Sequence, residues 1–180
     1  MVVIAYEGKS DGEFFDILLK DYDLPSNEVI YYDFEGKDNL FNILHPYYDE
    51  IEKKHLNKID AMLLVVDADN KKDPNPNRGY EASESKLKEV INDLSFDITI
   101  EYYIMCDENQ EGYLESFLLS VLQDKEKECI QSFKSCFEYD LSDKWVYNSF
   151  YKHNQHPFDL NHPNFDELKQ KQKSLFKEQI

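Results

Sequence analysis

The segment KIDAMLLVVDAD, residues 58–69, contains the clearest strand signal in the chain. Every residue from Ala61 to Val66 is apolar. An apolar run of this length without alternation is typical of a strand that is buried on both faces of a parallel sheet. Two aspartates, Asp67 and Asp69, follow the run directly. The predicted strand therefore ends in carboxylates.

Strand-like and helix-like segments alternate on both sides of this run. Short β-branched or aromatic runs predict strands, and longer segments with one apolar face predict helices. The expected strands are 2–6, 28–34, 61–66 and 96–105, and the expected helices are 10–22, 37–55, 81–94 and 112–122. This alternation implies right-handed crossovers between parallel strands. We predict an α/β fold with a mainly parallel sheet of about four strands and helices on both faces.

Local signals define the ends of two of these helices. Ser10 is the expected N-cap of the first helix, and Glu13 completes a capping box three residues later. Pro46 is expected to interrupt or end the second helix, because proline lacks the backbone N–H that a helix interior needs.

The chain is expected to form one α/β domain with an appendage. Residues 1–122 form the predicted α/β domain, and residues 123–180 are predicted to be a mainly helical C-terminal extension packed on it. The segment 70–80, rich in Asn and Pro, is expected to be a loop. A free extension would leave apolar side chains in water, so we expect these residues to dock it on the domain: Phe133, Phe137, Leu141, Trp145 and Phe150.

Composition limits the partners of the protein. The chain has 180 residues and a formal net charge of −17 at pH 7. Such a protein repels phosphate backbones, so tight nucleic-acid binding is disfavoured unless cations or a local basic patch intervene. The three cysteines form no Cys-x-x-Cys pair, which argues against a disulfide framework and a zinc knuckle. No segment is typical of a signal peptide or a membrane helix, so we expect a cytoplasmic protein without a membrane partner.

Acidic residues follow three of the predicted strands. Glu7 follows the first, Asp67 and Asp69 follow the third, and Asp107 or Glu108 follows the fourth. The carboxyl ends of parallel strands form one edge of the sheet, where open α/β sheets bind ligands. In extended backbone, the two aspartates after the third strand would face the same side. Carboxylates brought together repel one another unless a hard cation binds between them, so we predict a Mg²⁺ or Mn²⁺ site.

These residues resemble the TOPRIM domain shared by topoisomerases, primases and the overcoming-lysogenization-defect type of nuclease. Members of that family carry a Glu-Gly pair after the first strand, and Glu7 and Gly8 match it. They also carry an Asp-x-Asp motif after the third strand, and Asp67 and Asp69 match it. Glu115, in the segment GYLESFLL, is similar to a third acidic position of nuclease-like members. The resemblance covers the predicted α/β domain.

The resemblance implies divalent-metal-dependent phosphodiester chemistry on nucleic acid by a nuclease-like TOPRIM protein. Asp67 and Asp69 would hold the cation, and Glu115 would reach a second ion. Glu7 would be the catalytic residue, acting as general base or general acid, or would join as a ligand. Nucleic-acid binding would be weak and metal-dependent, with the nearby positive charges as its contacts: Lys9, Lys71, Lys72 and Arg78.

Other interpretations stay open. The chain has no room for the additional domains of topoisomerases or primases, and it lacks the Gly-x-x-x-x-Gly-Lys-Ser/Thr phosphate loop of ATPases. A catalytically inactive TOPRIM-like scaffold or protein-interaction module is therefore the alternative. A phosphate-accepting receiver-like domain fits less well, because only Glu7 ends the first strand. The histidines His153, His156 and His162 lie in a Pro- and Asn-rich break without metal-ligand spacing, so an ordinary loop is favoured there.

Overall fold

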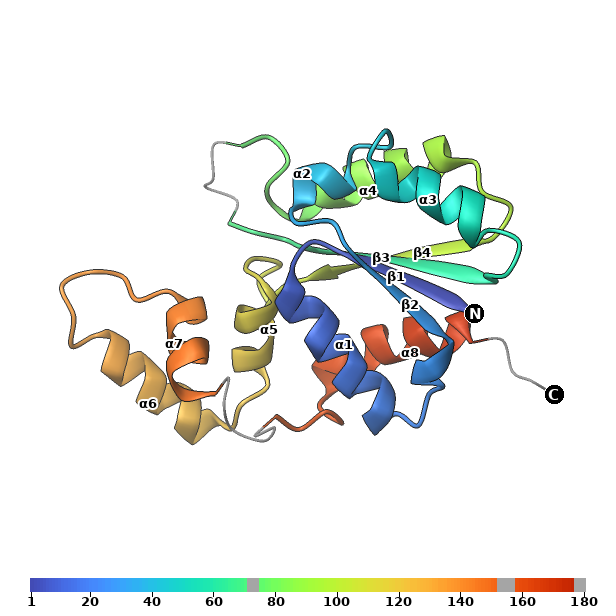
Figure 1. Ribbon diagram of the computed structural model, residues 1–180. Helices are drawn as coiled ribbons and strands as arrows, with labels where there is room; N and C mark the ends of the chain where they lie inside the picture. Colours follow the sequence, from blue (N-terminus) through green and yellow to red (C-terminus); the bar gives the residue numbers. More distant parts are fainter. Residues whose placement is uncertain (71–74, 152–157, 177–180) are drawn as a thin grey trace.

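The chain folds around one four-stranded sheet. A computed structural model describes residues 1–70, 75–151 and 158–176. The strand order is β2-β1-β3-β4, and every neighbouring pair is parallel. The strands are β1 (Val2–Tyr6), β2 (Val29–Asp33), β3 (Ala61–Asp67) and β4 (Thr99–Met105). The predicted α/β fold with a parallel sheet is confirmed (Figure 1).

β3 has the interior place that its apolar run predicts. It lies between β1 and β4, and all its residues from Ala61 to Val66 are buried. Its Leu63 pairs with Ile4 of β1 on one side and with Glu101 of β4 on the other. Helices cover both faces of the sheet, so an interior strand needs an apolar side chain at every position.

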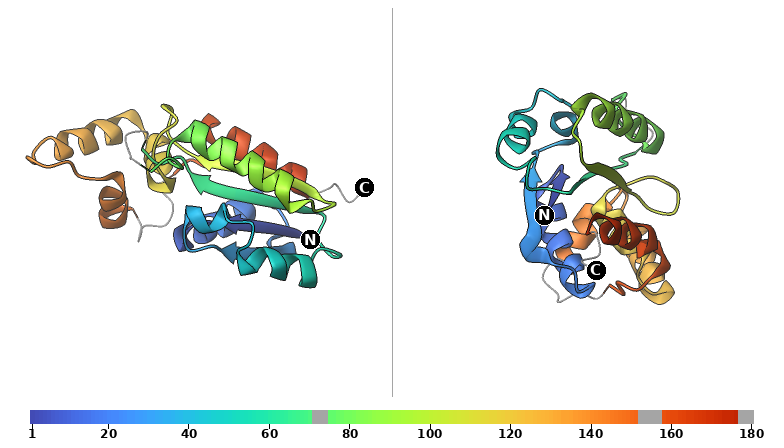
Figure 2. Two further views of the ribbon diagram at one scale, coloured as in Figure 1. Left: turned by 90° about the horizontal axis from the view of Figure 1, so that it is seen from above. Right: turned by 90° about the vertical axis from the view of Figure 1, so that its right-hand side faces the viewer.

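The helices form a layer on each face of the sheet, as Figures 1 and 2 show. One face is covered by α2 (Lys37–Leu40), α3 (Pro46–Lys54) and α4 (Tyr80–Leu94), and the other by α1 (Lys9–Asp21), α5 (Leu114–Ser120) and α8 (Asp166–Leu175). Side chains of β1 alternate between the two cores. Val2, Ile4 and Tyr6 pack in one core, and Val3 and Ala5 pack in the other.

The first helix begins in a different register from the one that its sequence predicts. Its N-cap is Gly8 in extended backbone, so the expected cap at Ser10 is wrong. The Gly8 N–H donates to Asp11 Oδ2 at 3.0 Å, so Asp11 takes the capping role that was expected of Glu13. Only Glu7 lies between the end of β1 at Tyr6 and the extended N-cap Gly8. This register turns the buried Asp11 side chain back toward the end of β1.

Pro46 is the first residue of a helix. The predicted helix over 37–55 consists of α2 and α3, with the interruption just before this proline. His45 caps α3, and its Nδ1 accepts a hydrogen bond from the Tyr47 N–H at 3.3 Å. Proline is favourable at the first helical position, because the N–H that it lacks would have no helical partner there.

The C-terminal segment is helical, and its last helix belongs to the main core. α8 covers the same face of the sheet as α1, and it is preceded by the short 3₁₀ helix Pro163–Phe165. Phe165, Leu168 and Leu175 are buried in the core that contains Ile4 and Leu63. The expected domain and its extension therefore share one core.

Two remaining helices extend past the carboxyl ends of the strands. They are α6 (Asp124–Lys134) and α7 (Asp143–Phe150), at the left of Figure 1. The docking expected of Trp145 and Phe150 is wrong, because these side chains are 45% and 49% exposed. They pack against Phe133 of α6, across the helix pair, while Leu141 and Val146 are buried. Among the described residues, no helix is long and apolar enough to cross a membrane.

Leu168→Ala is expected to destabilise the whole domain by about 2–5 kcal/mol, because it opens a cavity in the core beneath the sheet. Urea unfolding followed by circular dichroism measures the change. Lys173→Ala, at an exposed position of the same helix, is the control and should stay within about 0.5 kcal/mol of the wild type. A Leu168→Ala protein with unchanged global stability would show that α8 is a dispensable appendage.

Candidate functional site

Glu7 and Asp67 lie side by side at the carboxyl edge of the sheet. They follow β1 and β3, which are parallel neighbours with Tyr6 paired to Val65, so both chains leave the sheet at the same level. The two carboxyl groups lie within interaction range, since burial and then the Glu7 charge raise the pKa of Asp67, and both residues are partly buried. The structure thus brings together the first two of the predicted site residues.

The environment of this pair disfavours two negative charges. Burial raises the pKa of Glu7, and the nearby Lys37 ammonium offsets only part of that rise. Burial, followed by the Glu7 charge, raises the pKa of Asp67 well above its ordinary range. The Oε2 atom of Glu7 is buried and has no hydrogen-bond partner among the described residues. The pair therefore binds a proton, or another cation, more readily than isolated carboxyl groups would.

Asp11 joins the pair from the first turn of α1, and the sequence interpretation missed it. Its side chain is buried, and burial followed by the Glu7 charge raises its pKa to about 7. The charge of the buried Glu115 contributes to the same rise, so Glu115 lies near Asp11. We call Glu7, Asp11, Asp67 and Glu115 the carboxylate cluster. An acidic residue three positions after the glycine at the strand end was the available signal for Asp11.

The start of α5 contacts one member of the carboxylate cluster, Asp67, and contains another, Glu115. The backbone N–H of Leu114 donates to Asp67 Oδ1 at 2.9 Å, at the first residue of that helix. Glu115 is the next residue and is buried. A hydrogen bond from a helix N-terminus stabilises the ionised form of a carboxylate. It also orients the Asp67 side chain before any ligand binds.

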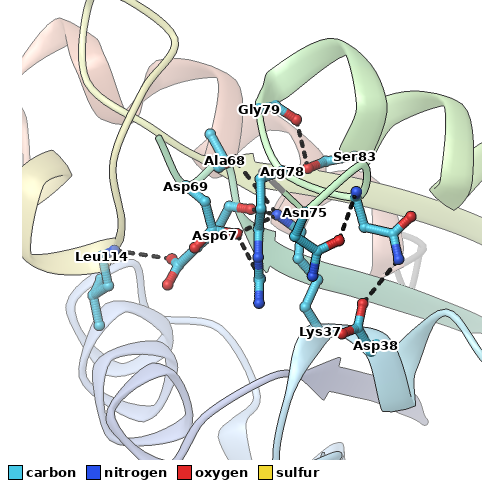
Figure 3. Close-up of polar contacts among 11 residues, drawn as sticks. Lys37, Asp38, Asp67, Ala68, Asp69, Asn75, Arg78, Gly79, Ser83 and Leu114 are labelled. Carbon is cyan, nitrogen blue, oxygen red and sulfur yellow. Dashed lines mark hydrogen bonds and ion pairs between the residues drawn. The ribbon is translucent and has the colours of Figure 1, made fainter. Parts of the chain in front are cut away.

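Asp69 is turned away from Asp67. The expectation that both side chains face one side assumed extended backbone, but Asp69 has φ 63°. Its N–H donates to the Gly112 carbonyl at 2.7 Å, and its carbonyl accepts from the Gly112 N–H at 3.1 Å. This short antiparallel bridge holds Asp69 in the left-handed conformation, and its carboxylate meets Lys37 and Arg78 instead (Figure 3).

The predicted nucleic-acid contacts lie in different surroundings. Lys9 is exposed at the first position of α1. Arg78 lies at the rim of the site, with its side chain 25% exposed. Lys71 and Lys72 lie outside the described residues. The structure thus describes two of the four predicted contacts.

The strand-end acid after β4 has a structural role. Asp107 Oδ1 accepts hydrogen bonds from the N–H groups of Asn109 and Glu111, at 2.8 and 3.1 Å. Glu108 is exposed in the same turn. These contacts stabilise the loop between β4 and α5. Asp107 therefore has its hydrogen-bond partners in this loop and is not a member of the carboxylate cluster.

In the part of the chain that the structure describes, no three or more His, Cys, Asp or Glu side chains are grouped as a ready metal site. A pair of carboxyl groups is nevertheless a sufficient protein contribution for Mg²⁺, which keeps several waters and often takes only one or two carboxylates. Glu7 and Asp67 fit that requirement, and they offer oxygen ligands only.

Residues 1–157 match the family described as "Protein of unknown function (DUF3226)", so the chain belongs to that family. The matched region contains the whole sheet and every member of the carboxylate cluster. A search of curated proteins and a search of solved structures found no match. Conclusions about function therefore depend on the geometry of the site.

Asp11→Asn is expected to stabilise the protein at about pH 8 by about 1–3 kcal/mol and to leave its stability unchanged below about pH 4. The folded-state pKa of Asp11 is about 7 against an ordinary value of 3.8, so the folded state holds this proton more tightly than the unfolded state. Protonation of Asp11 thus stabilises the folded wild type below about pH 4, and this stabilisation is lost as pH rises to about 7. The amide of Asp11→Asn cannot ionise, so the variant does not show this loss.

Urea unfolding at several pH values checks this expectation. Glu13→Gln is the control, because Glu13 is exposed on the same helix and should leave the pH profile unchanged. Superimposable profiles for Asp11→Asn and wild type would mean that Asp11 carries no buried charge.

Proposed function

We propose that this member of the DUF3226 family is a divalent-cation-dependent enzyme of phosphodiester chemistry, acting on nucleic acid in the manner of a TOPRIM-like nuclease. The observation that carries the proposal is the Glu7–Asp67 carboxyl pair at the ends of two neighbouring buried strands. The parallel sheet and the order of the two acidic motifs along the chain are those that the TOPRIM resemblance implies.

The donor set fits a hard cation. Glu7 has a buried carboxylate oxygen without a partner, and Asp67 is already oriented by the Leu114 N–H. Glu7 and Asp67 would hold Mg²⁺ or Mn²⁺, with Asp11 and Glu115 as further carboxylates on the α1 and α5 sides. When bound, the cation supplies Lewis-acid activation of a phosphoryl oxygen.

The protein's own groups supply the proton transfer. A catalytic acid or base must lie within reach of the proton that it transfers, and Glu7 lies at the proposed cation site. Glu7 would take a proton from the attacking water or give one to the leaving oxygen. Asp67 holds its orientation through Leu114, so it stays in place while Glu7 changes protonation.

Charge sets the strength of substrate binding. The net charge of −17 repels a polyanion at long range, so affinity depends on cations at the site and on local positive groups. Of the predicted nucleic-acid contacts, Arg78 and Lys9 are described at this edge of the sheet. Binding would be weak, metal-dependent and sensitive to salt.

A second candidate function is that of a scaffold for a protein partner. The observation in its favour is a groove of about 670 Å³ between α6 and α7. It is lined by Ile130, Phe133 and Phe150, and the exposed Trp145 stacks on Phe133. A partner could bind there in a protein with or without catalytic activity.

Added Mg²⁺ or Mn²⁺ is expected to raise the melting temperature of the wild type by about 4 °C at ten times Kd, since binding to the folded state alone contributes about 1.4 kcal/mol at that concentration. Asp67→Asn should lose most of this rise. Glu7→Gln should keep more of the rise and abolish cleavage, because an amide cannot transfer the proton. Thermal melts and a cleavage assay on single- and double-stranded DNA and RNA measure both effects.

Glu108→Gln is the matched control, because Glu108 is an exposed acid after β4 and lies apart from the carboxylate cluster. It should behave as the wild type in both assays. A wild type that shows no thermal shift with millimolar-range cation contradicts the metal site and favours the scaffold. A wild type that binds cation and cleaves none of the four substrates contradicts the nuclease assignment alone.

A further inference from the structure

One oxygen of Asp69 receives two cationic side chains. Its Oδ2 accepts from Lys37 Nζ at 2.7 Å and from Arg78 Nη1 at 2.8 Å, and the Asp69 side chain is only 16% exposed. Two positive groups meet at this one carboxylate. Against the opposing effect of burial, the Asp69 carboxylate and then the charge of Asp38 raise the pKa of Arg78. Cationic side chains therefore lie beside the carboxylate cluster.

Lys37 makes this arrangement rigid. Its side chain is 1% exposed, and its Nζ also donates to the backbone carbonyls of Asp67 and Ala68. A buried ammonium needs acceptors for its N–H groups, and it finds them where β3 leaves the sheet. Lys37 thereby holds the backbone that leads into Asp69.

Residues 75–79, the described segment that carries Arg78, are anchored by hydrogen bonds. The Gly79 N–H donates to the Ala68 carbonyl at 2.7 Å, and the Arg78 N–H donates to the Asn75 carbonyl at 3.1 Å. Asn77 Nδ2 donates to Asp38 Oδ1 at 2.9 Å, which links this loop to α2 (Figure 3). The Arg78 guanidinium is thus presented by an anchored segment at the rim of the site, where it contacts Asp69.

A divalent cation on Asp69 would lie beside two positive side chains. One carboxylate oxygen is already taken by Lys37 and Arg78, and like charges at hydrogen-bond range repel strongly in a partly buried site. The guanidinium donates to Asp69 Oδ2 through Nη1, and a guanidinium has five N–H donors in a fork that can form a planar pair with phosphate oxygens.

We propose that Asp69 is a positioning residue and not a cation ligand: with Lys37 it holds Arg78 at the rim of the carboxylate cluster, where the guanidinium binds a phosphate of the substrate. This inference deepens the proposed function and rests on it for the identity of the substrate. The site then has two halves. Glu7 and Asp67 would hold the cation, and Arg78 would hold a phosphate group of the substrate.

Two titrations on one set of variants test the assignment. Calorimetry measures Mn²⁺ binding, and fluorescence anisotropy at a fixed, saturating Mn²⁺ concentration measures binding of a labelled, nuclease-resistant single strand of about ten nucleotides at several salt concentrations. The variants are Asp69→Asn, Arg78→Gln, the double variant and Asp67→Asn.

Asp69→Asn is expected to keep Mn²⁺ affinity within about three-fold, whereas Asp67→Asn loses it. Asp69→Asn should also weaken oligonucleotide binding and lower the salt slope by about 0.7, the value of one phosphate contact on a single strand. Simple loss of a negative charge would strengthen that binding, so the sign separates positioning from bulk electrostatics. Arg78→Gln should have the same effect, and the double variant should be no weaker than Arg78→Gln alone.

Loss of Mn²⁺ binding in Asp69→Asn, with a melting curve that shows it folded, overturns the assignment and makes Asp69 a ligand. An unfolded Asp69→Asn protein leaves Arg78→Gln to decide, because that variant leaves Lys37 paired. An unchanged salt slope there also overturns the assignment. A wild type that binds Mn²⁺ but no oligonucleotide contradicts the proposed substrate, and the Mn²⁺ titration still decides whether Asp69 is a ligand.

Discussion

Glu7 and Asp67 are held next to each other at the ends of two buried parallel strands, and most features of this edge of the sheet respond to that proximity. Two carboxyl groups in such surroundings cannot both stay ionised without a counter-charge. Burial raises the pKa of each, and one oxygen of Glu7 has no partner among the described residues. The Leu114 N–H and the Lys37 ammonium offset part of the cost. A divalent cation would offset the rest.

The site is divided by charge. Asp11 and Glu115 extend the negative half toward α1 and α5, whereas Lys37 and Arg78 form the positive half around Asp69. An enzyme that cleaves a phosphodiester needs both kinds of surroundings, one for a cation and one for an anion. A very acidic protein gains more from a fixed local cation than a neutral one does, because its overall field works against the substrate.

A recurring tripeptide shows how strongly context decides a side chain's role. Glu-Gly-Lys follows β1 at residues 7–9 and follows β2 at residues 35–37. Each lysine is the first residue of a helix, yet Lys9 is exposed and Lys37 is buried against the end of β3. Gly36 has φ 137°, which residues other than glycine rarely adopt, whereas Gly8 is extended. The two loops therefore leave the sheet along different paths.

The sequence was informative where one kind of residue filled a whole element. The run from Ala61 to Val66 predicted an interior parallel strand, because only a strand covered on both faces needs such a pattern. The pairing of Glu7 with Asp67 followed from that fold. The position of Asp11 depends on the register of α1, and that of Asp69 depends on its own left-handed backbone conformation. Neither feature produces a periodic pattern of residues that the sequence could reveal.

Aromatic residues of the C-terminal segment were misplaced for a related reason. Their apolar character predicted that they would be buried, but it could not identify the element on which they pack. Trp145 and Phe150 pack on Phe133 within the α6–α7 pair, and the sheet is covered by α8 instead.

The central claim is that Glu7 and Asp67 together hold a divalent cation. Anomalous diffraction from crystals soaked in Mn²⁺, recorded near the manganese absorption edge, tests it most directly. The account predicts one strong anomalous peak between the carboxyl groups of Glu7 and Asp67, lost in crystals of Asp67→Asn. A peak confined to other acidic residues, such as Asp107 and Asp140, or no peak at all in well-diffracting soaked crystals, would contradict it.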